Sequence, residues 1–409
     1  MKRVRVSELV PGMTTAEDVY SFSNQLVVEK GTELTDKIIA RLEYYSVLSI
    51  RIAEQGESVE DSSTDEFGID LSALESMLGT KPEAGESDGK TVSIFNPPVV
   101  DTDSSTEGAL SFSDTPADMP YSSRIKATKQ FKEFEHSFVN NTEALKGNLN
   151  DIIKSNSVNT DVMLQSVSDL ISKSTTSLGM FDMLHNMRNY DDYTYVHSMS
   201  VSLICNIFGH WLNMNNSDIE VLTLAGLLHD IGKILVPDSI IKKPGKLTHD
   251  EYNKVKTHTL EGYKILKNLP IDQRIAEAAL LHHERCDGTG YPLSRGGRDI
   301  PDFAKIISIA DVYDAMTAAR VYRGPMCPFK VVSIFEQEGL QKYDSRYILT
   351  FLENIGQTYL NNRVRLSDGR EGDVMMIHKT CISRPLIKLL DGTFIDLVDE
   401  RDLFIDALI

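Results

Sequence analysis

Two pairs of adjacent residues carry side chains of the types that bind metal ions. His229 is followed directly by Asp230, and further along the chain His282 is followed by His283. Adjacent imidazoles and carboxylates place several nitrogen and oxygen ligands at closely spaced backbone positions, as a cluster of metal ions requires. Burying such groups without a metal would leave too many polar atoms without hydration. The two pairs therefore indicate a metal-dependent hydrolase.

Three further candidate ligands lie before, between and after these pairs, where apolar helical patterns end or present a polar face. They are His197, His258 and Asp311. Ligands spaced in this way allow different helices of a bundle to point their side chains at one centre. A lone histidine on an apolar face is more often an ordinary core residue, and this is the expectation for His136, His185, His210, His249 and His378.

The elements that must position these ligands have helical periodicity. Apolar residues recur at three-, four- and seven-residue steps, which is one face of a long helix, at Phe131, Phe134, Phe138, Leu145, Leu149 and Ile152. Core packing is the expected use of this face, and a dimer contact is the alternative. Further helical patterns cover residues 162–171, 195–208, 219–228, 250–266, 274–283, 303–319 and 347–354. The middle of the chain is therefore predicted to be all-α.

The composition changes on both sides of this helical region. Residues 1–53 hold short strand-like pieces around a helical stretch, which predicts a small N-terminal α+β module. Residues 54–120 are rich in Ser, Asp, Glu, Gly and Pro, which predicts an acidic flexible linker. Helical residues 121–360 form the predicted catalytic domain. Residues 361–409 alternate apolar and polar residues around two Asp-Gly turns, which predicts a small C-terminal β module.

Charge and cysteine usage limit the classes of partner and compartment. The 409 residues carry a formal net charge of -18, which argues against a nucleic-acid polymer as partner. The 4 cysteines show no C-x-x-C spacing, which suggests a reducing compartment. We find neither a signal-peptide pattern nor an apolar run long enough for a membrane span. A cytoplasmic protein is therefore expected.

A longer pattern around the ligand pairs resembles the HD-GYP family, cyclic di-GMP phosphodiesterases within the HD superfamily of metal-dependent phosphohydrolases. It consists of HDIGK at residues 229–233, HHERCDGTGYP at residues 282–292, and the segments 193–198 and 311–323. The HD pair alone is shared by many nucleotide hydrolases, whereas the combination is highly specific. The resemblance covers about residues 160 to 360 and implies an all-α HD-type helical catalytic domain.

The resemblance also implies a role for each matching residue. The metal ligands would be His197, His229, Asp230, His258, His282, His283 and Asp311, with Asp230 as the bridging carboxylate. Lys233 would lie beside the scissile phosphate, and phosphate oxygens would be held by Arg320 and Arg323. The loop lining the guanine pocket would contain Gly290, Tyr291 and Pro292. The alternatives are a solvated helix end for the arginines and a plain tight turn for the loop.

One position departs from the family pattern and bears on the number of metals. Members with three metals carry a glutamate four residues before the first histidine ligand, where this chain has Tyr193. Asp192 is five residues before His197 and would face a different direction on a helix. We therefore expect two divalent transition metal ions. Histidine and carboxylate ligands without thiolate suit iron or manganese first, with cobalt and nickel as alternatives.

The expected reaction opens cyclic di-GMP to linear pGpG, and a second cleavage to GMP is left open. Two metal ions about 3.5–4 Å apart lower the pKa of a shared water, so that hydroxide is available for in-line attack. Hydrolysis of another cyclic dinucleotide, such as cyclic GMP-AMP, is one alternative. A catalytically silent module that senses the nucleotide or docks a diguanylate cyclase is another. A homodimer is considered as a further assembly.

Overall fold

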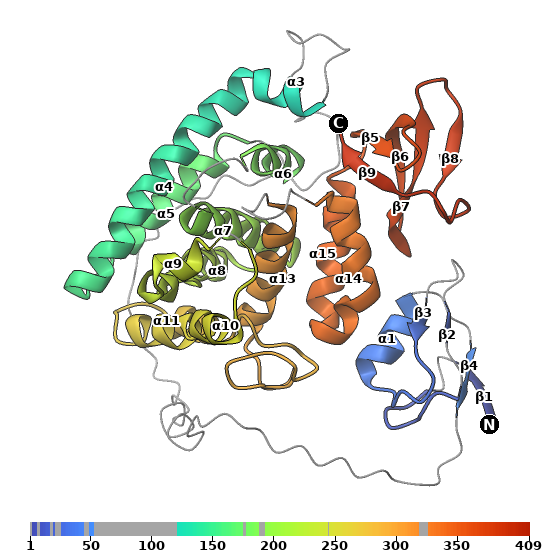
Figure 1. The fold of residues 1–409 in the computed structure, drawn as a ribbon, viewed down its shortest axis with the longest axis horizontal. Helices are drawn as coiled ribbons and strands as arrows, with labels where there is room; N and C mark the ends of the chain where they lie inside the picture. Colours follow the sequence, from blue (N-terminus) through green and yellow to red (C-terminus); the bar gives the residue numbers. More distant parts are fainter. Residues whose placement is uncertain are drawn as a thin grey trace.

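The computed structural model describes residues 2–5, 9–16, 19–20, 26–44, 49–52, 121–174, 177–187, 193–243, 245–318 and 326–409. The predicted acidic linker and both candidate phosphate-binding arginines, Arg320 and Arg323, lie outside the described residues. Figure 1 shows a helical domain with a β-sheet module at one side and a smaller mixed module beneath that sheet.

The helical domain begins at Tyr121 and ends at Gln357. Its elements in chain order are α3 (Tyr121–Ala127), α4 (Lys129–Ser155), α5 (Thr160–Ile171), α6 (Ser177–Asn186), α7 (Tyr193–Trp211), α8 (Asn216–Leu228), the 3-10 helix η2 (Ile231–Leu235), α9 (Asp238–Ile241), α10 (His249–Lys256), α11 (His258–Leu266), α12 (Gln273–Leu281), α13 (Asp302–Thr317), α14 (Pro328–Lys342) and α15 (Ser345–Gln357). None of the described helices is long and apolar enough to cross a membrane. The prediction of a helical domain is confirmed.

The long helix α4 lies along the outer side of the bundle (Figure 1) and contacts α5, α6 and α7. Thr128 caps its start by accepting a hydrogen bond from the backbone N–H of Phe131, and Asn156, directly after its last residue, has a φ of 50°. Its buried residues are Phe131, Phe134, Phe138, Thr142, Leu145, Leu149 and Ile152. The apolar face predicted from the sequence therefore packs into the core of the same chain.

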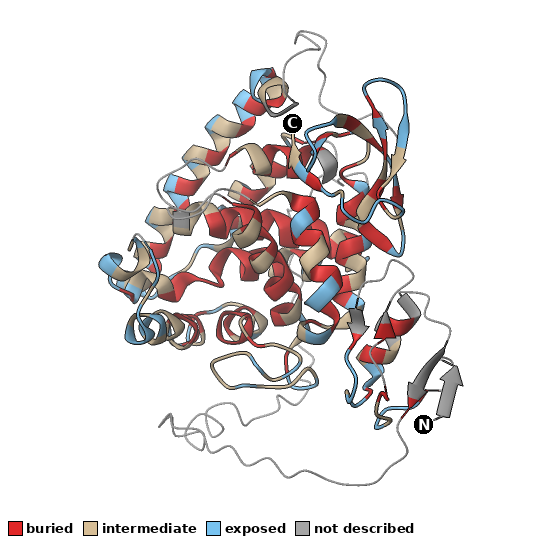
Figure 2. Cartoon of the chain, turned by 45° about the vertical axis from the view of Figure 1, so that its right-hand side comes forward, coloured by how far each residue is buried: buried red, intermediate tan, exposed pale blue. Residues whose placement is uncertain are grey.

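Four helices form the centre of the bundle. Helix α7 contacts α8 and α13, and α12 contacts both α8 and α13. Figure 2 shows the middle of the helical domain mostly in the colour of buried residues. A helix that is apolar all round belongs inside a bundle, because no face of it prefers water. These four helices give the ligands a rigid frame.

One predicted helix is two helices in the structure. The apolar pattern over residues 250–266 predicts a single helix, whereas α10 ends at Lys256 and α11 begins at His258. At the junction the hydroxyl of Thr257 donates to the carbonyl of Lys254 over 2.7 Å, and the backbone N–H of Thr257 donates to the same carbonyl. A hydroxyl bonded to the preceding turn competes with the helical ladder. The break places His258 at the start of its own helix.

The C-terminal module is an antiparallel sheet. Its strands are β5 (Arg363–Leu366), β6 (Glu371–His378), β7 (Cys381–Leu389), β8 (Phe394–Asp396) and β9 (Ile405–Leu408), in the order β8-β7-β6-β5-β9. Three successive hairpins join β5 to β8, and β9 pairs with β5. Gly369 and Gly392 have φ values of 89° and 88° in the two predicted Asp-Gly turns. Both predicted Asp-Gly hairpins are therefore confirmed, whereas the hairpin of β6 with β7 and the pairing of β9 with β5 were not predicted.

The β module shares a core with the helical domain, because one continuous apolar cluster includes Phe335 and Ile348 of the bundle and Ile382 and Ile387 of the sheet. The N-terminal residues have a separate small cluster. Their described elements are β1 (Lys2–Arg5), β2 (Val19–Tyr20), β3 (Leu26–Val28), α1 (Asp36–Tyr44) and β4 (Ser49–Ile52). Strand β1 pairs with β4 and β2 pairs with β3, both antiparallel.

Candidate metal centre

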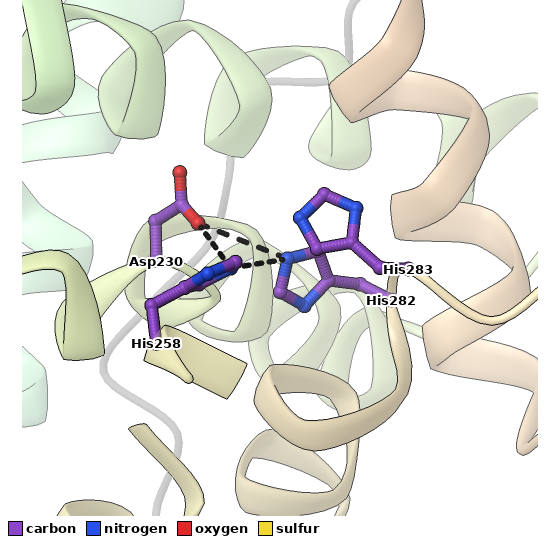
Figure 3. Close-up of side chains that lie close together, drawn as sticks. All are labelled: Asp230, His258, His282 and His283. Carbon is purple, nitrogen blue, oxygen red and sulfur yellow. Dashed lines mark hydrogen bonds and ion pairs between the residues drawn. The ribbon is translucent and has the colours of Figure 1, made fainter. Parts of the chain in front are cut away.

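Seven histidine and aspartate side chains from five parts of the helical domain form two adjoining groups. Their ligand atoms lie within 4.8 Å of one another inside each group. One group contains His197 of α7, His229 at the end of α8 and Asp311 of α13. The other contains Asp230, His258, His282 and His283. All seven predicted ligands are therefore brought together, and Figure 3 shows the side chains of the second group pointing toward one another.

Asp230 joins the two groups through its two carboxylate oxygens. Its Oδ1 lies 3.3 Å from Nε2 of His258 and 3.7 Å from Nε2 of His282. Its Oδ2 lies 3.3 Å from Nε2 of His229 and 3.8 Å from Nε2 of His197. The side chain of Asp230 is fully buried. One carboxylate thus faces both groups, which is the geometry of a bridging ligand.

Hydrogen bonds to the backbone fix the orientation of three histidines. The Nδ1–H of His229 donates to the carbonyl of Gly226 over 2.7 Å, and that of His258 donates to Val255 over 2.6 Å. His282 donates in the same way to the carbonyl of Ala279 at 3.0 Å. A ring that uses Nδ1 as a donor keeps the lone pair of Nε2 available. In all three cases that nitrogen points to the centre.

His197 is held by two carboxylates of α13 rather than by the backbone. Its Nδ1 lies 2.7 Å from Oδ2 of Asp314, and its Nε2 lies 3.0 Å from Oδ1 of Asp311. Burial lowers the pKa of His197, but its contacts with Asp311 and Asp314 outweigh burial and raise the pKa to about 9. Asp314 was not among the predicted site residues. Its spacing of three residues from Asp311, one helical turn, is the signal that could have identified it.

The imidazoles of the second group are held in the neutral form that binds metals. Burial, together with the neighbouring His229, lowers the pKa of His282 to about 3. Burial also holds the pKa of His283 well below its ordinary value, with His282 as the next cause. Neutral imidazole is the ligand form of histidine. These two adjacent rings, 4.1 Å apart between centroids, therefore have the protonation state of ligands.

Two buried polar atoms at the centre test whether the group fits a metal. Among the described residues, Nε2 of His229 and Oδ1 of Asp230 are buried and have no hydrogen-bond partner in the protein. Unsatisfied buried polar atoms are rare in native proteins and require an explanation. Both atoms are of ligand type, and both face the other ligands. The donor set therefore fits divalent metal ions.

Gly232 allows the segment after Asp230 to lie against α11. A Cβ built on Gly232 would come within 2.0 Å of the carbonyl oxygen of His258 and 2.6 Å of the backbone nitrogen of Gly262. Only a residue without a side chain permits this approach. The close packing brings Asp230 next to His258. It also places Lys233, in η2, where its ammonium donates to Oδ2 of Asp230.

Lys233 is the largest favourable influence on the ionisation of Asp230. Burial alone would raise the pKa of this carboxyl group. The charge of Lys233 and the contacts with His229 and His258 outweigh burial and hold the pKa well below its ordinary value. Asp230 is therefore a carboxylate, as a bridging ligand must be. Lys233 contacts this ligand directly, in addition to any role at a phosphate.

The loop between α12 and α13 covers one side of the centre. Glu284, which is buried, accepts hydrogen bonds from the backbone N–H groups of Leu293 at 2.6 Å and Arg295 at 2.9 Å. The ring of Tyr291 stacks on His283 with a centroid distance of 4.7 Å. A Cβ on Gly290 would lie 2.4 Å from Cα of Glu284. Sequence reasoning missed Glu284, although it directly follows the His pair.

Two predicted features cannot be placed. Arg320 and Arg323 lie outside the described residues. Tyr193 begins α7, but nothing is described of its side chain, and Asp192 lies outside the described residues. Pro292 follows Tyr291 in the loop that covers the centre. The guanine-pocket and two-metal predictions therefore stay predictions.

Comparisons with known proteins agree with the geometry. A family model described as the HD domain matches residues 163–347. A cyclic di-GMP phosphodiesterase of Pseudomonas aeruginosa is 34% identical over 208 residues, which are 50% of this chain and 50% of that protein. A 3'3'-cGAMP-specific phosphodiesterase of Vibrio cholerae is 37% identical over 168 residues, which are 41% and 39% of the two chains. The chain thus spans half or less of the length of these curated relatives.

A solved structure of similar extent is an HDG"Y"P protein from Bdellovibrio bacteriovorus. It is 16% identical and has a TM-score of 0.43. The match covers 87% of this chain and 99% of that one.

Proposed function

We propose that the chain, whose residues 163–347 match the HD domain family model, is a metal-dependent phosphodiesterase that hydrolyses cyclic di-GMP. The observation that carries the proposal is the position of Asp230, whose two carboxylate oxygens face two separate groups of ligands. A bridging carboxylate between histidine-rich groups is the arrangement of two-metal hydrolytic sites. Phosphoric diesters are a substrate class for such sites.

The residues would divide between two metal ions. One ion would be held by His197, His229 and Asp311, the other by His258, His282 and His283, with Asp230 shared. When bound, such a pair supplies Lewis acidity at the phosphoryl oxygen and lowers the pKa of a water molecule. Iron or manganese suits this donor set first, with cobalt and nickel as alternatives. The substitution of glutamate by Tyr193 supports two ions rather than three.

Side chains of the protein would supply positive charge at the phosphoryl group and would hold the candidate ligands in position. Lys233, held at the centre by Asp230, would neutralise negative charge that develops on the phosphoryl group. The Nδ1 hydrogen bonds of His229, His258 and His282 keep their Nε2 atoms in place without reorganisation. Arg320 and Arg323 would hold phosphate oxygens of the bound substrate. Because they would act on substrate and transition state alike, their loss should raise KM.

Cyclic di-GMP is the proposed substrate, with pGpG as first product and GMP as the product of a second cleavage. The cyclic di-GMP phosphodiesterase of Pseudomonas aeruginosa supports this choice. The 3'3'-cGAMP-specific relative favours the second candidate, cyclic GMP-AMP. Both substrates present a guanosine and two phosphodiesters. They differ in one purine, so the choice between them depends on the residues that contact the bases.

The domain division and the compartment belong to the same proposal. We divide the chain at residues 1–53, 54–120, 121–360 and 361–409, and the start of β5 at Arg363 supports the last boundary. Four free cysteines, two buried and two partly buried, support a reducing compartment such as the cytoplasm. The homodimer and the diguanylate cyclase partner stay predictions.

A competition assay tests the substrate. The purified, metal-reconstituted chain is given cyclic di-GMP and cyclic GMP-AMP at equal concentrations, and the products are separated by anion-exchange chromatography. The proposal expects pGpG to form first and in excess. Faster consumption of cyclic GMP-AMP would select the second candidate. Tight binding of either nucleotide without any product would contradict both and identify a sensing module.

A further inference from the structure

Four side chains form a column that leads from a ligand of the candidate metal centre to the surface. The ring of Tyr291 stacks on His283, with centroids 4.7 Å apart and an interplanar angle of 28°. The ammonium of Lys256 lies 5.8 Å from the centroid of Tyr291 and 5.2 Å from that of Tyr252. The outermost residue, Tyr252, is 47% exposed. The column therefore begins at the metal centre and ends with an aromatic ring in contact with water.

Helix α10, which supplies Tyr252 and Lys256, contacts the loop that contains Tyr291 through Lys256. The two residues are four positions apart and so lie on one face of the helix. A capping box fixes its start, since Thr248 accepts from the N–H of Glu251 and Glu251 accepts from the N–H of Thr248. Lys243 pairs with the Glu251 carboxylate at 2.6 Å. A fixed helix presents both side chains at low entropic cost.

The exposed aromatic ring is not explained by packing. In the described structure α10 has no fully buried residue, and Tyr252 is among its most exposed large side chains. A half-exposed tyrosine whose ring neighbours a cation is a surface on which a planar, electron-rich group can stack. Nucleobases stack on such rings in this way, whatever their identity. The ring alone would bind any purine.

The ammonium of Lys256 adds the means to distinguish purines. Lysine is a donor only, and it offers no acceptor. Guanine presents two acceptors, O6 and N7, along one edge, whereas adenine presents a donor, its N6 amino group, in place of O6. The ammonium of Lys256 would therefore attract the O6 and N7 edge of guanine and would be partly repelled by the N6 amino group of adenine.

We propose that Tyr252 and Lys256 form a guanine subsite of the candidate metal centre, in which Tyr252 stacks on the base and Lys256 selects guanine over adenine. The inference rests on the proposed phosphodiesterase function, because it names the base that the same centre receives. In the column Tyr291 covers His283 and Lys256 lies next outward, so a base stacked on the exposed ring of Tyr252 would turn its acceptor edge toward the ammonium of Lys256. Neither Tyr252 nor Lys256 was among the residues predicted from the sequence.

The test compares three substrates on four proteins. The substrates are cyclic di-GMP, cyclic di-AMP and glycerophosphocholine, a phosphodiester that has neither a base nor any aromatic ring that could stack on Tyr252. The proteins are the unaltered chain, Tyr252→Ala, Lys256→Met and the control Lys254→Met. Lys254 is an exposed lysine of the same helix, and its offset of two positions places it on a different face. The metal content and the circular dichroism spectrum are measured for each protein.

Each variant has its own expected result. Tyr252→Ala should raise KM for cyclic di-GMP by roughly 5- to 100-fold, the range that loss of one aromatic stack gives. Lys256→Met should lower the ratio of kcat/KM for cyclic di-GMP to that for cyclic di-AMP by roughly 10-fold. Lys254→Met should leave both quantities unchanged. Isothermal titration with pGpG should show the same weakening in Tyr252→Ala, independently of turnover.

The outcomes separate this inference from the proposed function. If the unaltered chain cleaves cyclic di-GMP and both variants keep its KM and its preference for guanine, the subsite is wrong while the phosphodiesterase stands. An equal loss on the base-free diester would also overturn the subsite, because it would place the effect at the metal centre. If the unaltered chain cleaves only the base-free diester, both the proposed function and the guanine subsite are refuted.

Discussion

Lys233 donates a hydrogen bond to Oδ2 of Asp230, the same carboxylate oxygen that faces His229 and His197. The contact spans three residues of the chain, from the end of α8 into η2. It places a positive charge against the carboxylate that joins the two ligand groups. Lys233 is partly exposed, so part of its side chain contacts solvent.

Lys233→Ala should lower kcat by roughly 10²-fold or more, the scale seen when one transition-state donor is removed. The reason is that its charge meets the phosphoryl group where negative charge develops. Steady-state kinetics at measured metal content checks this, with Lys242→Ala as control. Lys242 is exposed and pairs with Asp238, outside the centre. A change in KM alone would contradict the assignment.

Asp314→Asn should weaken metal binding by roughly 10- to 100-fold, the usual effect of losing a carboxylate that orients a histidine ligand. The Nδ1 of His197 lies 2.7 Å from Oδ2 of Asp314, and a neutral amide holds an imidazole less firmly. Competition with a chelator measures the affinity. Asp302→Asn, in the exposed first turn of the same helix, is the matched control. Equal affinities in both variants would mean that Asp314 only packs.

Gly232→Ala should destabilise the fold by about 1–3 kcal/mol or more, because overpacking forces backbone shifts. The added Cβ would meet the carbonyl oxygen of His258 at 2.0 Å, and that atom has no room to move. Urea unfolding gives the free energy. The control is Gly147→Ala in α4, where nothing lies within 4 Å, and a gain of about 0.5–1 kcal/mol is expected. Equal stability of the two variants would refute the close approach.

Glu336 of α14 joins the helical domain to the β module, and its replacement should change how stability depends on pH. Its carboxyl group accepts hydrogen bonds from Ile382 and Ser383 of β7. Burial raises its pKa from 4.5 to about 7. The folded state therefore keeps a proton that the unfolded state loses, and this stabilisation is full below pH 4.5 and disappears as pH rises through 7.

Glu336→Gln should remove that dependence, which amounts to about 3 kcal/mol at most. The measurement is the free energy of unfolding in urea at pH 5 and pH 8 for both proteins. As pH rises, the free energy of unfolding of the glutamine variant should increase relative to that of the unaltered chain. Parallel pH profiles would show that Glu336 titrates normally.

Much of the candidate centre could be predicted, because only a few residue types bind metal ions. The adjacent histidine and aspartate pairs indicate metal binding by themselves, and the family resemblance supplies the full set of seven candidate ligands, which the structure brings together. The Asp-Gly turns were equally clear, since positive φ at Gly369 and Gly392 restricts the residue types. These signals are local, and they depend on neighbours within a few residues.

Long-range contacts could not be predicted in the same way. Asp314 lies one helical turn from the candidate ligand Asp311, but its contact with His197, 117 positions away, depends on how α13 packs against α7. The pairing of β9 with β5 depends on the packing of the whole module. The break at Thr257 has a local cause, the side-chain bond to Lys254, yet the apolar period continues through it. Such features depend on the tertiary structure.

The most direct test of the central claim is the conversion of cyclic di-GMP by the unaltered chain and by Asp230→Asn, both loaded with the same metal. Asparagine keeps the size of the side chain but cannot share a negative charge between the two ligand groups. The account predicts that the unaltered chain, holding two metal ions, releases pGpG, and that Asp230→Asn releases none above background while remaining folded. Equal turnover by the two proteins, or no turnover by the fully loaded unaltered chain, would contradict it.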